Sequence, residues 1–85
     1  MRSHKDFEDI IRTIHPEADF FDFDPARDDP RHSWFELPGD TRIRRKALDN
    51  FGIHISSASR TSRGTRNIQA IDTLKYPVGM FSDDR

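Results

Sequence analysis

The chain has 85 residues, a net charge of −1, no cysteine and only 33% hydrophobic residues. This length admits one hydrophobic core, so we expect a single small domain over residues 1–85, while the lack of cysteine excludes disulfides, thiolate zinc sites and thiol nucleophiles. No apolar run approaches the roughly 20 residues that cross a bilayer, and the polar residues 1–5 are unlike a signal peptide, so we expect a cytoplasmic protein with no membrane partner.

The first predicted element is a helix over residues 4–14. Ser3 and Asp6 have the spacing of a capping box, in which a serine hydroxyl and an acidic side chain satisfy free amides of the first turn. Pro16 ends the pattern, because proline disfavours helical backbone at the residue before it. Four apolar residues recur three or four positions apart and share one helix face: Phe7, Ile10, Ile11 and Ile14.

Residues 16–32 contain three prolines and six acidic residues, and we expect an acidic loop region there. Within it, the aromatic run 20–23 predicts a short strand. Residues 33–37, which are followed by Pro38-Gly39, predict a second strand. These two strands are expected to pair as a loose hairpin across the acidic loop.

A second helix is predicted over residues 41–51. Asp40-Thr41 offers an N-cap, and Gly52 supplies the left-handed residue that commonly follows the end of a helix. The apolar residues that share its inner face are Ile43, Ala47, Leu48 and Phe51. The opposite face of this helix carries most of its charged residues.

After the second helix the period of the apolar residues changes to two. Ile53 and Ile55 alternate with polar residues, as in a half-buried strand. Residues 59–66 are polar, contain one glycine and predict a hairpin tip, after which residues 68–74 predict a return strand or a segment of mixed structure.

The remaining residues predict a turn with apolar anchors over 76–81 and a frayed tail over 82–85. The elements follow the order α-β-β-α-β-β, which indicates the α+β class, with two amphipathic helices packed on a small antiparallel sheet. The low apolar fraction of a short chain also favours a homodimer, because a second copy adds buried area.

Charge is distributed unevenly along the chain. Residues 1–40 carry eleven acidic and five basic residues, a balance of −6, whereas residues 41–85 carry four acidic and nine basic residues, a balance of +5. Such a chain has a dipolar surface unless the fold interleaves its halves and lets them neutralise each other.

Within residues 42–66, seven basic residues accompany one acidic residue, Asp49. The planar fork of arginine fits phosphate oxygens, and nearby serine and threonine hydroxyls add phosphate contacts. Our leading hypothesis is a small non-catalytic regulatory protein that binds nucleic acid, or a complex that handles it, through an arginine-rich helix and hairpin. An ordinary solvated surface is the alternative, which the pI of 6.4 favours. The predicted binding residues are Arg42, Arg44, Arg45, Lys46, Arg60, Arg63 and Arg66.

The acidic and aromatic residues around the first predicted strand support a second hypothesis. An exposed loop of this kind suits a protein-binding inhibitor or adaptor, of the type that phages use, which docks on a basic partner surface with aromatic anchors. In the competing interpretation, the phenylalanines belong to the core and the aspartates form turns. The predicted contact residues are Asp22, Phe23, Asp24, Asp28, Asp29 and Trp34.

A third hypothesis is a small metal-independent ribonuclease, in which His32 or His54 serves as general base and arginine stabilises the phosphate. No two histidines are three or four residues apart, and the Asp22-x-Asp24 pair lacks the other ligands of a calcium-binding loop. Motifs for phosphate-binding loops, serine hydrolases and dinucleotide sites are absent as well. We therefore predict no metal, no cofactor and no catalytic residue.

Overall fold

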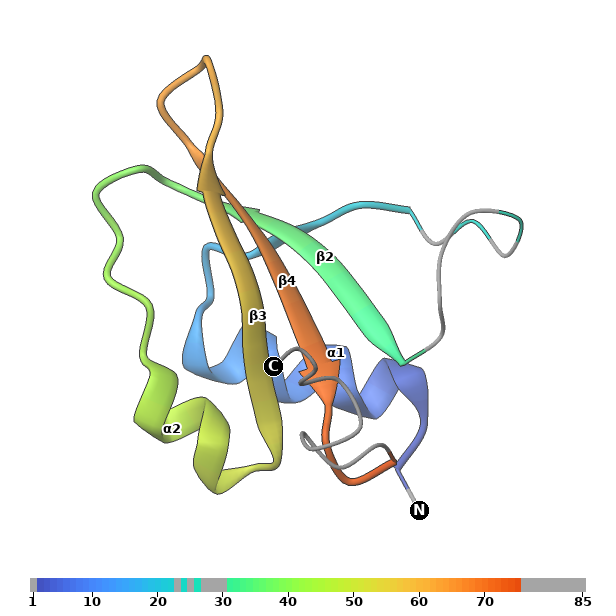
Figure 1. Ribbon diagram of the computed structural model, residues 1–85. Coiled ribbons are helices and arrows are strands. Elements are labelled where there is room, and N and C mark those ends of the chain that lie inside the picture. Colours follow the sequence, from blue (N-terminus) through green and yellow to red (C-terminus); the bar gives the residue numbers. More distant parts are fainter. Residues whose placement is uncertain (1, 23, 25, 27–30, 76–85) are drawn as a thin grey trace, which may run out of the picture.

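Figure 1 shows the protein as a computed structural model that describes residues 2–22, 24, 26 and 31–75. Its elements are, in chain order, α1 (His4–Ile14), β1 (Asp19–Phe20), β2 (His32–Leu37), α2 (Arg45–Asn50), β3 (Ile53–Arg60) and β4 (Arg66–Asp72). Two helices and a four-stranded antiparallel sheet confirm the predicted α+β class. Neither described helix has the length and apolar character needed to cross a membrane. The predicted turn over 76–81 and tail over 82–85 lie outside the described residues.

The sheet has the strand order β1-β2-β4-β3, so the last strand of the described residues, β4, lies inside it, and every neighbouring pair is antiparallel. The pairing of β1 with β2, in which Phe20 lies opposite Phe35, confirms the predicted hairpin. However, β1 is shorter than the predicted run 20–23 and begins one residue earlier, at Asp19. A bulge between Ile55 and Ser57 interrupts the pairing of β3 with β4.

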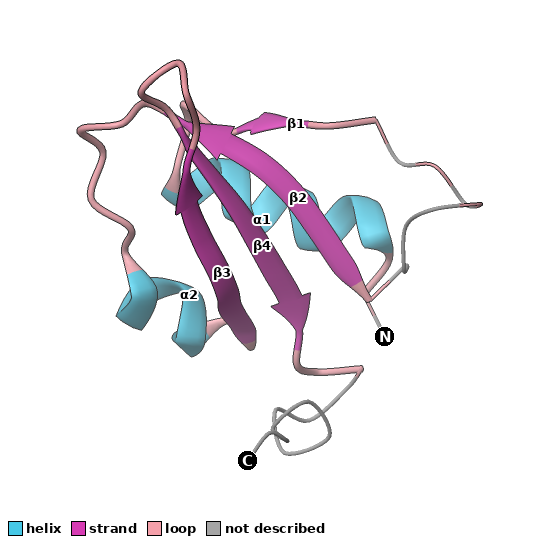
Figure 2. Cartoon of the chain, turned by 45° about the horizontal axis from the view of Figure 1, so that its top comes forward, coloured by secondary structure: helices cyan, strands magenta, loops and turns pink. Residues whose placement is uncertain are grey.

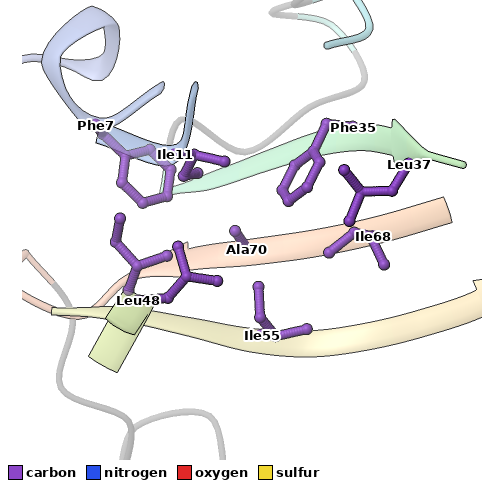
Figure 3. Packing of buried hydrophobic residues seen from close by; sticks show 9 residues of the cluster. Phe7, Ile11, Phe35, Leu37, Leu48, Ile55, Ile68 and Ala70 are labelled. Carbon is purple, nitrogen blue, oxygen red and sulfur yellow. The ribbon is translucent and has the colours of Figure 1, made fainter. Parts of the chain in front are cut away.

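The hydrophobic core lies between the two helices and one face of the sheet. Figure 2 shows α1 crossing behind the strands and α2 beside β3, and Figure 3 shows their side chains meeting those of the sheet. Because side chains alternate along a strand, every second residue of β2 and β4 reaches this core. Its fully buried members are Phe7, Ile11, Phe35, Leu37, Leu48, Ile53, Ile55, Ile68 and Ala70.

α1 has the bounds that the sequence predicts, and its capping box is formed. The backbone amide of Asp6 donates to Ser3 Oγ at 3.1 Å, and the amide of Ser3 donates to Asp6 Oδ2 at 3.3 Å. His15 caps the other end, where its amide donates to Ile11 O at 2.7 Å. Local sequence signals at both ends therefore fix this helix.

α2 is shorter than predicted, and the proposed cap at Asp40-Thr41 is wrong. The helix begins at Arg45 after Arg44, which makes no side-chain capping bond. The amide of Thr41 instead donates to Pro38 O at 3.0 Å and closes a turn. Gly52 does take the predicted left-handed conformation, with φ of +72°, and its amide donates to Asp49 O at 2.9 Å.

The loop between β2 and α2 contacts the β3–β4 hairpin. A Cβ atom added to Gly39 would lie 1.8 Å from the carbonyl oxygen of Gly64 and 3.3 Å from an Arg60 guanidinium nitrogen. Only glycine allows the two backbones to approach this closely. Residues 38–44 therefore start at the hairpin tip and end at α2 (Figure 1).

Candidate nucleic-acid interface

The predicted basic residues fall into two groups. Three lie on the β3–β4 hairpin, two (Arg42 and Arg44) lie in the segment that leads into α2, and two (Arg45 and Lys46) begin α2, which contacts the sheet mainly at β3. The connecting segment starts beside the hairpin, where Gly39 meets Gly64, so Arg42 lies at most about 11 Å and Lys46 at most about 25 Å from that contact. Residues 38–44 connect them along one side of the molecule (Figure 1). We call six of these residues the basic strip: Arg42, Arg44, Arg45, Lys46, Arg60 and Arg66.

The six residues of the basic strip have no ion pair with any carboxylate in the described part of the chain. All are exposed except Arg66, which is half-buried at the end of β4. By contrast, Arg2 pairs with Asp72, and Arg12 pairs with Glu8 and Asp9. The cations of the strip are thus free to meet an external anion.

Arg63 differs from the strip, because it forms an ion pair with Glu36 of β2. Thr65 Oγ1 donates to the same carboxylate at 2.7 Å. The hydrogen bond from Thr65 and the Arg63 guanidinium lower the pKa of Glu36. These contacts tie the hairpin tip to β2, and they occupy the Arg63 side chain that the sequence indicated as a ligand-binding group.

The acidic and basic halves of the chain meet at a few places in the described structure. β1, which belongs to the acidic half, and β3, which belongs to the basic half, form opposite edges of the sheet. Among the described ion pairs, only Arg63–Glu36 joins a cation of residues 41–85 to a carboxylate of residues 1–40. A second pair, Arg2–Asp72, joins the halves in the other direction, and Glu17 and Asp40 of the acidic half line a pocket together with Arg42 and Arg44. The dipolar surface therefore stays a prediction from the sequence.

A pocket of about 610 Å³ lies between the end of α1 and residues 38–44, beside the basic strip. Arg42, Arg44 and the buried His15 are among its lining residues. The His15 side chain is 2% exposed, and its Nε2 accepts a hydrogen bond from the Arg44 amide at 3.1 Å. The sequence analysis did not assign this role to His15, although the residue directly follows the predicted helix over 4–14.

Burial lowers the pKa of His15, and the Arg44 charge lowers it further against the opposing effect of Glu17. His15 is therefore a neutral acceptor that joins the end of α1 to the start of α2. The neutral form is required because a protonated imidazole cannot accept the Arg44 amide.

We expect the free energy of unfolding to fall as the pH drops below about 6.5. A histidine whose pKa is lower in the folded state binds more protons when unfolded, so acid favours unfolding from the ordinary pKa of 6.5 down to the folded value. Urea denaturation at pH 7.5 and pH 5.0 measures this loss. His15→Gln, compared with wild type, should show a smaller loss, and an equal loss in both proteins would contradict the assigned role.

The acidic-aromatic residues are only partly within the described structure. Asp22 and Asp24 are exposed, whereas Phe23, Asp28 and Asp29 lie outside the described residues. Trp34 is half-buried on the sheet face turned away from the core. The described structure therefore does not bring the second set of predicted contact residues together.

His32 and His54 lie on that same sheet face, on either side of Ile71 of β4. Gln69 bonds His32 Nδ1 at 3.0 Å, and its other amide atom accepts from Ser56 Oγ at 2.7 Å. The register places no arginine or lysine of the described strands on this face. The arrangement thus lacks the phosphate-stabilising cation that the ribonuclease hypothesis needs near the histidines.

A serine, a histidine and a glutamate also meet between α1 and β2. Ser33 Oγ lies 3.2 Å from His4 Nε2 and 3.0 Å from Glu8 Oε2. Ser33 is only 3% exposed, so it is not placed to attack a substrate. We assign this cluster to the joint between helix and sheet. The described residues include no group of three histidine, aspartate or glutamate side chains arranged around a metal position.

Comparisons of the chain with protein-family models, with curated proteins and with solved structures give no match. Its function therefore has to be inferred from its own residues and their arrangement.

Proposed function

We propose that the protein is a non-catalytic module that binds nucleic acid, alone or within a nucleic-acid-handling complex, through the basic strip. The observation that supports this proposal is the set of six cations along one side of the molecule without an ion pair in the described structure. Arginine in this state keeps its full fork of donors for phosphate oxygens.

The spacing of the two groups suits an extended polyanion better than a small anion. From the hairpin contact at Gly39 to Lys46 the strip extends over at most about 25 Å, which corresponds to up to about seven nucleotides along one strand of a duplex. Neutralising phosphates releases condensed counterions, and this release drives binding at low salt. A ligand that contacts the whole strip is therefore an extended chain of phosphates such as an oligonucleotide.

Arg63 has a supporting role in this proposal. Its pairing with Glu36 holds the hairpin against β2, and the neighbouring Arg60 and Arg66 then face the ligand. The two arginines lie opposite each other at the end of the β3–β4 ladder, where their like charges repel. A bound phosphate between them relieves this repulsion.

We expect Arg60→Gln/Arg66→Gln to weaken binding about tenfold or more, because a charged hydrogen bond contributes roughly 1.5–3 kcal/mol. Arg42→Gln/Arg45→Gln should have a similar effect. Each pair of substitutions should also lower the slope of log Kd against log salt by about 1.4, because each phosphate contact on a single strand contributes about 0.7. Fluorescence anisotropy of a labelled 12-nucleotide strand measures both quantities.

The matched control is Lys5→Gln/Arg12→Gln, which removes the same charge from α1, away from the strip. The control should bind within about threefold of wild type, because long-range charge effects are screened beyond roughly 10 Å at 0.1 M salt. An equal loss in the control and the strip variants would contradict the assignment of the strip. No binding of wild type at low salt would favour the protein-binding hypothesis instead.

A further inference from the structure

The pocket beside the basic strip has both an apolar part and two carboxylates, a combination that neither a solvated loop nor a phosphate site requires. Arg42 and Arg44, two residues of the strip, belong to its lining. A strand whose phosphates follow the strip therefore passes the mouth of the pocket. The volume of about 610 Å³ is within the range of small-molecule sites.

The pocket has an apolar part that can receive a flat ring. Ile14 and Ile43 line it and also pack against the hydrophobic core, which fixes their positions. Pro16 and Pro38 add rigid apolar surface from the two loops. Apolar surface of this kind packs against the face of an unstacked base by the hydrophobic effect, which does not depend on sequence.

The polar part of the pocket carries two carboxylates, those of Glu17 and Asp40. Neither carboxylate has an ion pair in the described structure, and both residues are exposed. Carboxylates repel phosphate, so the pocket is unsuited to the backbone itself. They accept hydrogen bonds from base amino groups, such as N4 of cytosine, whereas thymine has a carbonyl oxygen at the equivalent position.

We propose that this pocket binds one unstacked base of single-stranded nucleic acid and prefers an amino-bearing base, cytosine or adenine, to thymine or uracil. The proposal rests on the proposed function, because the strip must first hold the backbone. Bases in a duplex are paired and stacked, so a duplex cannot fill the pocket unless a base flips out. The ligand class is therefore a single strand.

The test compares three labelled 12-mers by fluorescence anisotropy across one series of salt concentrations: an all-thymine strand, the same strand with a central cytosine, and a duplex. Wild type should bind the cytosine-containing strand about tenfold more tightly than the all-thymine strand. Glu17→Gln/Asp40→Asn should bind both strands with similar affinity and keep the salt slope of wild type. The matched control is Asp19→Asn/Asp49→Asn, which removes two exposed carboxylates outside the pocket and should keep the preference.

The outcomes separate this proposal from the proposed function. Equal affinity of wild type for the two single strands, or an unchanged preference in Glu17→Gln/Asp40→Asn, overturns the base pocket while leaving binding to the strip intact. Tighter binding of the duplex than of either strand also overturns it. If none of the three 12-mers binds at low salt, the proposed function fails, and the base pocket fails with it.

Discussion

Asp72→Ala is expected to lower the free energy of unfolding by about 3–5 kcal/mol, the cost of removing one partner from a buried ion pair. The Asp72 carboxylate is 1% exposed and accepts from Arg2 Nη2 at 2.8 Å and from Arg2 Nε at 3.3 Å. The Arg2 guanidinium also donates to the carbonyl oxygens of Phe51 and Gly52 at 2.5 and 3.0 Å. One residue pair thus joins the start of the chain, the end of α2 and the end of β4.

Urea denaturation followed by circular dichroism measures this loss. Asp49→Ala, which removes an exposed aspartate from α2, is the matched control and should change the free energy of unfolding by less than about 0.5 kcal/mol. Arg2→Ala/Asp72→Ala should lose less than the sum of the two single variants, because it leaves no buried charge without a partner. A loss below about 1 kcal/mol for Asp72→Ala would show that the pair does not hold these segments together.

Phe35→Ala is the second change with a large expected effect, again about 3–5 kcal/mol. Phe35 is 0% exposed in the middle of β2, and its ring centroid lies 5.0 Å from that of Phe20. Its removal leaves a cavity between α1, β1 and the sheet. Small domains have free energies of unfolding of only about 5–15 kcal/mol. We therefore expect a large fraction of the Phe35→Ala protein to be unfolded near 37 °C.

Thermal unfolding checks this expectation, with Phe51→Ala as the control. Phe51 is 52% exposed, so the same substitution there should lower the Tm far less. Equal shifts in Tm for the two variants would contradict the core described above. Of the phenylalanines in the acidic segment, Phe20 packs on Phe35 and the core, whereas Phe21 is 43% exposed.

Elements specified by local signals were predicted well from the sequence. α1 has its predicted bounds because Ser3, Asp6 and Pro16 act on residues close to them in the chain. α2 starts later than expected because its first residue is fixed by a distant group, His15, through the Arg44 amide. The central position of β4 likewise depends on pairing with two strands that no short pattern can reveal.

The candidate site likewise has features that the sequence predicted and features that depend on residues far apart in the chain. Composition alone located the arginines, but it could not show that Arg63 is paired while Arg60 and Arg66 are not. That difference depends on the register that brings Glu36 close to the hairpin. The pocket was also beyond sequence reasoning, because its walls come from segments more than twenty residues apart.

The central claim is that the six cations of the basic strip neutralise phosphates of a single strand. The most direct test is the affinity of wild type for a labelled 12-nucleotide strand, measured by fluorescence anisotropy across a series of salt concentrations. With six contacts, the slope of log binding constant against log salt should be about −4, at 0.7 per phosphate. A slope near zero, or no binding at low salt, would contradict the claim.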